Sequence, residues 1–305
     1  MKRRVAGRTG LPLSELGLGC SSFWAKPVFP EAQALALVEA AIARGITFFD
    51  TGASYAAGNA ERRLGLVLKN HRANRDIVVA TKVGTQVAAD GSAYKDWSRA
   101  AVRASVERSL DRLGLSRIDI LHLHGPSRAD LTPELIGTLE ELRRAGLVRF
   151  IGINSFDDEV VRAGLRLPNF DSFLIEYNVL KKKNRALIDD IAAAGRAVLI
   201  GTPVAQALFT NNVFALNHLR NVWGLLRALR HHRRELAAAF RYRFLNRVPG
   251  MSGPQAALAY VLRHPQISTA IFGTTQLAHL EQNVAAAALT LPPDVAARIE
   301  RLSDA

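Results

Sequence analysis

The run Ile118-Asp119-Ile120-Leu121-His122-Leu123-His124 decides the fold, because it is an apolar β-type segment that ends on a polar, chemically useful side chain. Three further apolar runs end in the same way. The run 46–49 is closed by Asp50, the run 77–81 by Lys82, and the run 150–153 by the pair Asn154-Ser155. Polar residues placed repeatedly at strand ends are typical of a (β/α)8 barrel with its active site on one rim.

Apolar β-type runs alternate with stretches of helical period almost from end to end. The predicted strands are 16–19, 46–50, 77–81, 118–123, 149–153, 173–177, 197–201 and 269–272. The predicted helices are 30–44, 59–69, 98–113, 133–145, 157–165, 185–194, 222–243 and 277–288. Units of this kind with short connections favour a closed parallel barrel over an open sheet. We therefore expect one α/β domain over 1–305, a TIM barrel.

Local signals support these boundaries. Ser98 and Thr132 are suited to cap helix N-termini, and Pro133 follows at a first helical position. Four glycines follow helical stretches, as C-terminal caps do. They are Gly45, Gly114, Gly146 and Gly195.

Two segments fall outside the repeating units. Residues Val5 to Leu13 predict an N-terminal hairpin, with a turn at Thr9-Gly10, that covers the bottom of the barrel. A long insertion from Thr210 to about Pro254 follows the seventh strand and contains a basic, helix-like stretch at 227–234. Long loops at this rim shape substrate or cofactor sites.

Composition indicates a soluble globular enzyme, with 49% hydrophobic and 22% charged residues. No apolar stretch is long enough to span a membrane, and the basic start lacks the apolar core of a secretory signal. A single cysteine, Cys20, excludes an intrachain disulfide and predicts a cytoplasmic location.

The formal net charge of +13 is open to three interpretations. It reflects a solvated basic surface, a polyanionic small ligand such as a phosphorylated dinucleotide, or nucleic acid. No nucleic-acid motif accompanies the charge, so we rank nucleic acid last.

Four strand-end and loop residues form a plausible catalytic set. Tyr55 can protonate a carbonyl oxygen, but a phenol is a weak acid at its reference pKa of about 10. An ammonium group such as that of Lys82 stabilises phenolate and makes proton transfer at neutral pH more favourable. A buried lysine needs a carboxylate, which Asp50 supplies, and His124 can orient the carbonyl. Each residue alone also has a structural explanation, and their joint occurrence favours function.

At these residues the chain resembles the aldo-keto reductases, NAD(P)H-dependent barrel enzymes that reduce aldehydes and ketones. The stretches 49–55 and 60–65 are similar to the family's Asp-Thr-Ala-x-x-Tyr-Gly and Ser-Glu-x-x-Leu-Gly signatures. The strand 79–82 is similar to its lysine strand, and 119–126 to its Asp-to-His spacing followed by His-x-Pro. The resemblance implies that Asp50, Tyr55, Lys82 and His124 are the catalytic tetrad, with Tyr55 as the acid.

The resemblance also implies a cofactor site, with departures. The family's Ser-Asn after strand five reads Asn154-Ser155 here, its glutamine is Leu174, and Gly201-Thr202-Pro203 replaces an aromatic-Ser-Pro pattern. The region that binds the adenosine 2′-phosphate lacks the expected Lys or Arg. NADP(H) is favoured slightly over NAD(H). The implied cofactor-binding residues are Gly19, Asn154, Ser155, Thr202, Pro203, Gly273, Thr274, Thr275, His279, Gln282 and Asn283.

The leading hypothesis is an oxidoreductase that interconverts a carbonyl compound and an alcohol. A cofactor-binding regulatory protein on the same barrel is the alternative, and a nucleic-acid binder acting through 220–247 comes third. Trp24, Trp97 and Trp223 are expected near the substrate, either as a clamp or as rim packing. We expect no metal, because His231-His232 has no ligand partners at zinc spacing.

Overall fold

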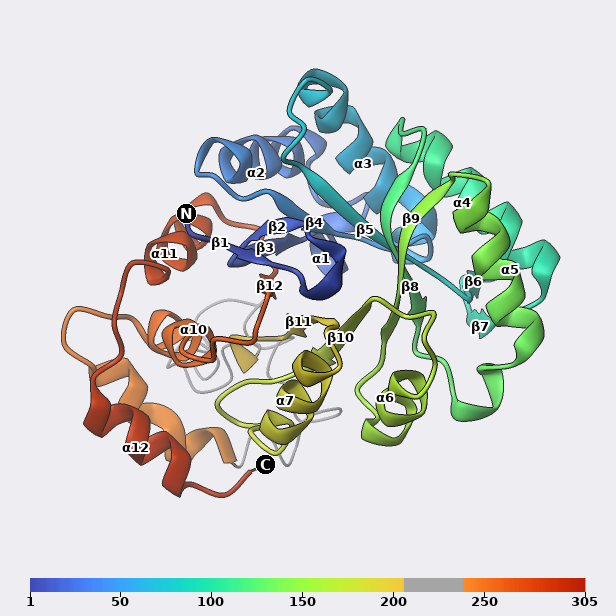
Figure 1. Cartoon of the computed structure of the whole chain (residues 1–305). Coiled ribbons are helices and arrows are strands. Elements are labelled where there is room, and N and C mark those ends of the chain that lie inside the picture. Colours follow the sequence, from blue (N-terminus) through green and yellow to red (C-terminus); the bar gives the residue numbers. More distant parts are fainter. Residues whose placement is uncertain (206–237, 305) are drawn as a thin grey trace.

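The strands close into one parallel barrel, which confirms the predicted TIM-barrel architecture. The computed structural model describes residues 1–205 and 238–304. Its eight barrel strands neighbour one another in the order β10-β11-β12-β3-β4-β5-β8-β9, and the two ends of this series meet. Figure 1 shows the helices arranged around the outside of these strands.

Each predicted barrel strand is present, within a few residues of the expected bounds. The strands are β3 (Leu16–Gly19), β4 (Phe48–Asp50), β5 (Val78–Val83), β8 (Ile118–His124), β9 (Val148–Asn154), β10 (Ser172–Glu176), β11 (Ala197–Gly201) and β12 (Thr269–Phe272). Because all of them are parallel, their carboxyl ends share one rim of the barrel.

Seven of the predicted helices are also present. They are α2 (Glu31–Ala43), α3 (Asn59–Leu68), α4 (Arg99–Leu113), α5 (Pro133–Arg144), α6 (Asp158–Leu165), α7 (Arg185–Ala193) and α11 (Leu277–Ala286). The predicted caps are confirmed: the Ser98 side chain accepts from the Ala101 amide and Thr132 from the Leu135 amide. The predicted helix 222–243 lies outside the described residues except for 238–243, and most of the predicted insertion also lies outside them.

The N-terminal hairpin closes the bottom of the barrel, as predicted. Strands β1 (Arg3–Val5) and β2 (Pro12–Ser14) pair antiparallel, and a short 3-10 helix, η1 (Gly7–Thr9), joins them. The predicted turn residues Thr9 and Gly10 lie in this connection: the Thr9 hydroxyl donates to the Ala6 carbonyl, and Gly10 is left-handed and ends η1. Leu11 and Leu13 then pack on apolar side chains inside the barrel.

Several elements have no counterpart among the predictions. They are α1 (Ser22–Ala25), the hairpin β6 (Thr85–Val87) with β7 (Ala93–Lys95), α10 (Gly253–Leu262) and α12 (Pro293–Arg301). Helix α10 has a clear start, since Ser252 and Gln255 form a capping box. It lacks a helical period because seven of its ten residues are buried, so it is apolar nearly all round.

Four more 3-10 helices complete the described part: η2 (Tyr55–Gly58), η3 (Lys69–His71), η4 (Arg128–Asp130) and η7 (Phe240–Arg247).

The core has an inner and an outer part. Inside the barrel, Phe48, Val78, Ile120 and Leu199 pack with the N-terminal hairpin. A larger cluster fills the space between the strands and the surrounding helices. None of the helices in the described part of the chain is both long and apolar enough to cross a membrane.

Helices α3 and α4 approach closely at Gly65. A Cβ atom there would lie 2.2 Å from the Arg112 carbonyl oxygen and 2.9 Å from the Leu113 Cα. We expect Gly65→Ala to destabilise the protein by about 1–3 kcal/mol, because backbone atoms must move apart. Gly137, in the middle of α5, has nothing within 4 Å of such a Cβ. Gly137→Ala should therefore stabilise by about 0.5–1 kcal/mol. Urea unfolding of both variants tests this, and equal effects would contradict it.

Candidate active site

Strand pairing gathers the predicted catalytic residues at one rim. Asp50 ends β4, Lys82 lies near the end of β5, and His124 ends β8, and these three strands are neighbours in the barrel. Tyr55 follows β4 as the first residue of η2. The structure thus brings together side chains that lie up to 74 positions apart in the sequence, since the set runs from Asp50 to His124.

The Lys82 ammonium is buried and held by two oxygen atoms. It donates to Asp50 Oδ2 at 2.6 Å and to the Thr51 carbonyl oxygen at 2.6 Å. Burial by itself lowers the pKa of Lys82, but attraction to Asp50 and to Tyr55 outweighs burial, so the pKa is raised from its ordinary value. Lys82 therefore stays charged at neutral pH, in a site where only 2% of its side chain is exposed.

The Tyr55 ring lies between the lysine and the histidine. Its centroid is 4.9 Å from Lys82 Nζ, and it meets the His124 ring edge-on, with centroids 5.6 Å apart and planes at 90°. The Tyr55 hydroxyl is also a hydrogen-bonding neighbour of the ammonium. A cation close to the phenol stabilises phenolate, which is what a proton-donating tyrosine needs.

The loop that carries Tyr55 is fixed by a charged group that sequence reasoning missed. Arg112, on α4, contacts the Ala53 carbonyl oxygen and pairs with Glu61 Oε2 at 3.2 Å. The other oxygen of Glu61 accepts from the Thr81 hydroxyl, next to Lys82. Gly58 has a φ of +92°, which L side chains rarely adopt, and a Cβ there would also displace the Arg112 guanidinium. The sequence does not indicate these contacts of Arg112 and Glu61, because the residues come from separate segments that only the fold brings together.

His124 stays neutral. Burial, followed by the nearby charges of Lys82 and Lys95, lowers the pKa of His124 to about 3. Lys95, on the β6–β7 hairpin, donates to the His124 carbonyl oxygen and to Thr85 Oγ1. A neutral imidazole offers one ring N–H as a hydrogen-bond donor. Lys95 is a second contributor that the sequence did not indicate.

His122 lies fully buried inside the barrel, in register with Lys82. Its Nε2 is 3.1 Å from Ser172 Oγ, and burial lowers its pKa well below the ordinary value. Gly152 makes the room for this pair, because a Cβ there would lie 2.5 Å from His122 Cδ2.

Residues expected at the nicotinamide end of the cofactor share the same rim. Asn154 Nδ2 donates to the Leu174 carbonyl oxygen at 3.3 Å, which leaves Asn154 Oδ1 without a partner among the described residues. Ser155 Oγ accepts from the Asp157 amide, so its hydroxyl proton remains available. Thr202 adopts a left-handed conformation and donates to Glu176 Oε1, and Pro203 next to it is buried. Gly19 ends β3, and a Cβ there would lie 3.3 Å from Ile271 Cγ2.

Phe156 completes this part of the rim and was not among the predicted residues. Half of its surface is exposed, and its ring lies 3.3 Å from where a Cβ at Gly201 would be. It stands beside Asn154-Ser155 and over the position where the sequence pattern lacks an aromatic residue. The only signal in the sequence was an aromatic residue directly after Ser155.

The residues expected around the adenosine phosphate follow β12 at the same rim. Thr274 Oγ1 accepts from the Gln276 amide and donates to the Gln276 carbonyl, just before α11 begins. His279 and Gln282 are exposed on α11, whereas Asn283 is buried. Gly273 is exposed and Thr275 half-buried.

Comparison with known proteins identifies the family. The model of the aldo/keto reductase family matches residues 15–304. This chain belongs to the aldo/keto reductase family. It is 30% identical over 289 residues to the uncharacterized oxidoreductase YqkF of Bacillus subtilis, covering 94% of this chain and 91% of that protein. It is 32% identical to the L-galactose dehydrogenase of Arabidopsis thaliana, with 93% of this chain and 87% of that protein covered.

A solved structure agrees with this assignment. The holo form of the aldo-keto reductase AKR11C1 from Bacillus halodurans matches with a TM-score of 0.82 and 28% identity. The match covers 100% of this chain and 97% of that one. The chain is thus similar to an oxidoreductase whose structure was solved in a holo form.

The two described tryptophans differ in their surroundings. Trp24 is 3% exposed, and its indole N–H donates to the Ala34 carbonyl oxygen, so it packs against α2. Trp97 is half-buried under Lys95, and its Nε1 has no partner in the described residues. Of the two, Trp97 has a free hydrogen-bonding group near the site. Trp223 lies outside the described residues.

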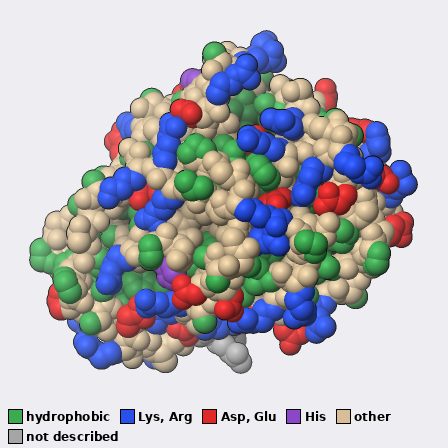
Figure 2. All heavy atoms as spheres, viewed as in Figure 1, with side chains coloured by type: hydrophobic (Ala, Val, Ile, Leu, Met, Phe, Trp, Pro, Cys, Tyr) green, Lys and Arg blue, Asp and Glu red, His purple; other side chains and the backbone are tan. Residues whose placement is uncertain are grey.

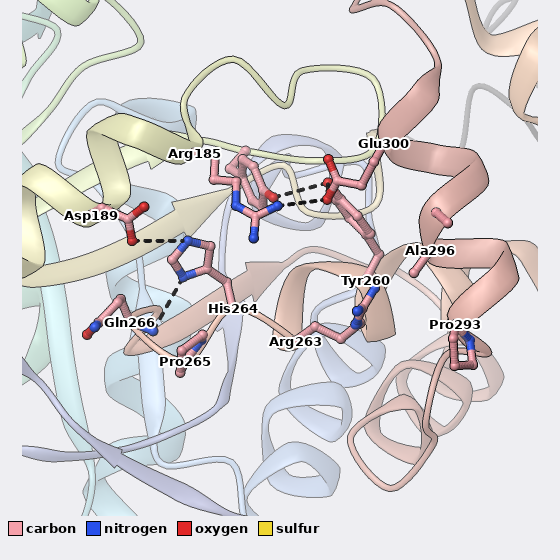
Figure 3. A pocket seen from close by; sticks show the side chains of 12 residues that line it. Arg185, Asp189, Tyr260, Arg263, His264, Pro265, Gln266, Pro293, Ala296 and Glu300 are labelled. Atoms are coloured by element: carbon pink, nitrogen blue, oxygen red, sulfur yellow. Dashed lines mark hydrogen bonds and ion pairs between the residues drawn. The ribbon is translucent and has the colours of Figure 1, made fainter.

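Figure 3 shows a separate cavity of about 470 Å³ between α7, α10 and α12. Arg185 donates to Glu300 at 3.0 Å, and the Tyr260 hydroxyl donates to the same carboxylate at 2.9 Å. His264 faces Asp189 across 3.5 Å. These charges are already matched within the protein, so the cavity is a seam that holds α12 against α7. Within residues 1–205 and 238–304, no group of three or more His, Cys, Asp or Glu side chains is placed to hold a metal ion.

The low pKa of His124 has a consequence for stability. An unfolded histidine titrates near 6.5, whereas folded His124 does so at about 3, so the unfolded chain binds more protons between these values. His124 therefore stabilises the fold above pH 6.5, and that stability is lost as pH falls toward 3. Between pH 5.5 and 4, His124→Gln should reduce the slope of unfolding free energy against pH by about 1.4 kcal/mol per pH unit. Urea titrations at several pH values measure it, and parallel slopes would contradict it.

Proposed function

We propose that this protein is an NAD(P)H-dependent oxidoreductase that reduces an aldehyde or ketone to an alcohol, or catalyses the reverse reaction. The observation that carries this proposal is the buried Lys82–Asp50 pair directly against the Tyr55 phenol, with neutral His124 on the other side. The combination gives one proton donor whose conjugate base is stabilised, and one neutral hydrogen-bond donor.

In the direction of reduction, the carbonyl oxygen accepts hydrogen bonds from Tyr55 and from a ring N–H of His124. The Tyr55 hydroxyl gives its proton to that oxygen as negative charge develops there, and Lys82 stabilises the phenolate that remains. Asp50 keeps Lys82 charged and fixed in place. A bound reduced nicotinamide supplies the hydride that the carbonyl carbon receives.

The rim fits such a cofactor in three respects. A carboxamide has N–H donors and a C=O acceptor. The free Asn154 Oδ1 can accept from its N–H group, and the Ser155 hydroxyl can donate to its C=O group. Phe156 offers an exposed aromatic face next to Gly201 for stacking on the ring. The start of α11, with Thr275 and His279, suits a phosphate, and on this basis we keep NADP(H) ahead of NAD(H).

Removal of the Tyr55 hydroxyl tests the role of the acid. Tyr55→Phe should lower kcat for carbonyl reduction by about 10²–10⁴-fold while NADPH still binds, because only the proton donor is lost. Nicotinamide absorbance with a panel of aldehydes and ketones, with NADPH and NADH in parallel, measures it. Tyr94→Phe, on the exposed β7 strand, is the matched control and should leave kcat unchanged.

The same assay decides between enzyme and binding protein. Wild-type turnover that persists in Tyr55→Phe would reject Tyr55 as the acid. Tight NADPH binding without turnover of any carbonyl compound would favour the regulatory alternative on the same barrel.

Phe156 gives a test of the cofactor face. Phe156→Leu should weaken NADPH binding by about 2–10-fold, the loss expected for one aromatic stacking contact, and Phe156→Tyr should restore it. Cofactor titration by intrinsic fluorescence quenching measures Kd. Equal Kd values for Leu, Tyr and wild type would show that the ring does not contact the cofactor.

A further inference from the structure

A large hollow lies at the rim opposite the catalytic tetrad. Its volume is about 960 Å³, and it is formed where the segments leading into β5, β8 and β9 meet. Four arginines line it, which we call the basal arginines: Arg72, Arg75, Arg117 and Arg149. They come from three separate segments of the chain, so only the fold brings them together.

The basal arginines have no counter-charge bound to them. Within the described part of the chain, none of the four makes a side-chain hydrogen bond or ion pair. Arg149 lies over the Phe150 ring at 5.0 Å, and the charges of Arg149 and Arg117 act on the nearby Asp119 carboxyl. Some other exposed arginines on this molecule have carboxylate partners. Examples are Arg44 with Glu281, Arg162 with Asp190 and Arg185 with Glu300. Arg166 and Arg301 have none among the described residues but stand apart from the hollow.

The acidic groups near the hollow do not neutralise it. Asp119 is the only carboxylate in its lining, and it accepts the Val79 amide proton at 3.0 Å. Burial raises the pKa of Asp119, and the Val79 amide and the charges of Arg149 and Arg117 oppose that shift. Glu39 is bonded to His71, and Asp76 to Arg3. Four guanidinium groups therefore face one partly buried carboxylate.

A purely structural role accounts for only part of this arrangement. Arg72 and Arg117 follow the C-terminal ends of α3 and α4, where a cation gains about 0.3–1 kcal/mol from the helix dipole. That benefit applies to each cation separately. Bringing four of them around one concave space adds mutual repulsion, which a bound anion relieves. Figure 2 shows that many Lys and Arg side chains also lie scattered over the surface, so charge alone does not define a site.

We propose that the basal hollow binds a compact phosphorylated small molecule with two or more phosphate groups. Guanidinium groups bind phosphate through paired N–H donors, and several arginines at one concavity select for more than one phosphate. Asn74 and Ser116 in the same lining add neutral donors, and Leu68, Ile77 and Leu115 offer an apolar wall to an organic part. Because the tetrad lies at the opposite rim, such a ligand occupies a site separate from the catalytic one.

Calorimetric titration with inorganic tripolyphosphate at about 150 mM salt tests the proposal, since this salt screens exposed charges beyond about 8 Å. Arg75→Glu/Arg117→Glu should weaken binding by at least about tenfold, through the loss of two charge-assisted contacts. The matched control is Arg166→Glu/Arg301→Glu, which has the same net charge but changes exposed arginines outside the hollow. It should change Kd by less than about threefold.

Other outcomes overturn the proposal. Equal losses in both variants would show non-specific attraction to a basic protein, and no loss in either would place the anion elsewhere. Competition by saturating NADPH would place it in the active site. If the charge-reversed variant does not fold, as judged by its circular dichroism, Arg75→Gln/Arg117→Gln replaces it with the same expected direction.

Discussion

The buried ion pair between Lys82 and Asp50 is the interaction on which the rest of the site depends. Two charges removed from water are favourable only while each has its partner, and loss of one partner of such a pair costs about 3–5 kcal/mol. The pair fixes the lysine against the Tyr55 ring and keeps it charged. Since the two residues lie on adjacent strands, the pair depends on the observed register between β4 and β5.

Cationic side chains bound to backbone carbonyls hold the loops around this pair. Arg112 contacts the Ala53 carbonyl, and Lys95 donates to the carbonyl of His124. The buried Arg63 donates to the carbonyls of Trp24 and Phe29, which fixes the segment after β3. Part of the high positive charge of the chain is thus used inside the structure, to position loops that a strand alone would leave free.

The remaining charge is distributed unevenly between the two rims. At the catalytic rim Lys82 has oxygen partners, and in the cavity of Figure 3 Arg185 is paired with Glu300. At the opposite rim, the basal arginines line one hollow without an ion pair in the described part of the chain. Our proposal of an anion site rests on this contrast, because an unpaired charge gains free energy from a counter-ion whereas a paired one does not.

The sequence by itself determined the barrel and indicated the four side chains, Asp50, Tyr55, Lys82 and His124, that meet at its rim. The apolar runs and the polar residue after each run follow from strand geometry, since parallel strands buried on both faces must be apolar until they reach a rim. It missed α10, because a helix buried nearly all round has no amphipathic period.

Only the tertiary structure decided the support for the tetrad and the surroundings of the other site residues. Arg112 and Lys95 reach the site from other segments, and no spacing in the sequence marks them. Phe156 follows Ser155 directly, but only the fold places its ring against Gly201. The low pKa of His124 likewise arises from burial and from two lysines that are distant in the sequence. The physical reason is common to all of these: local sequence sets strand, helix and residue type, whereas charge pairing and burial depend on which segments the closed barrel brings together.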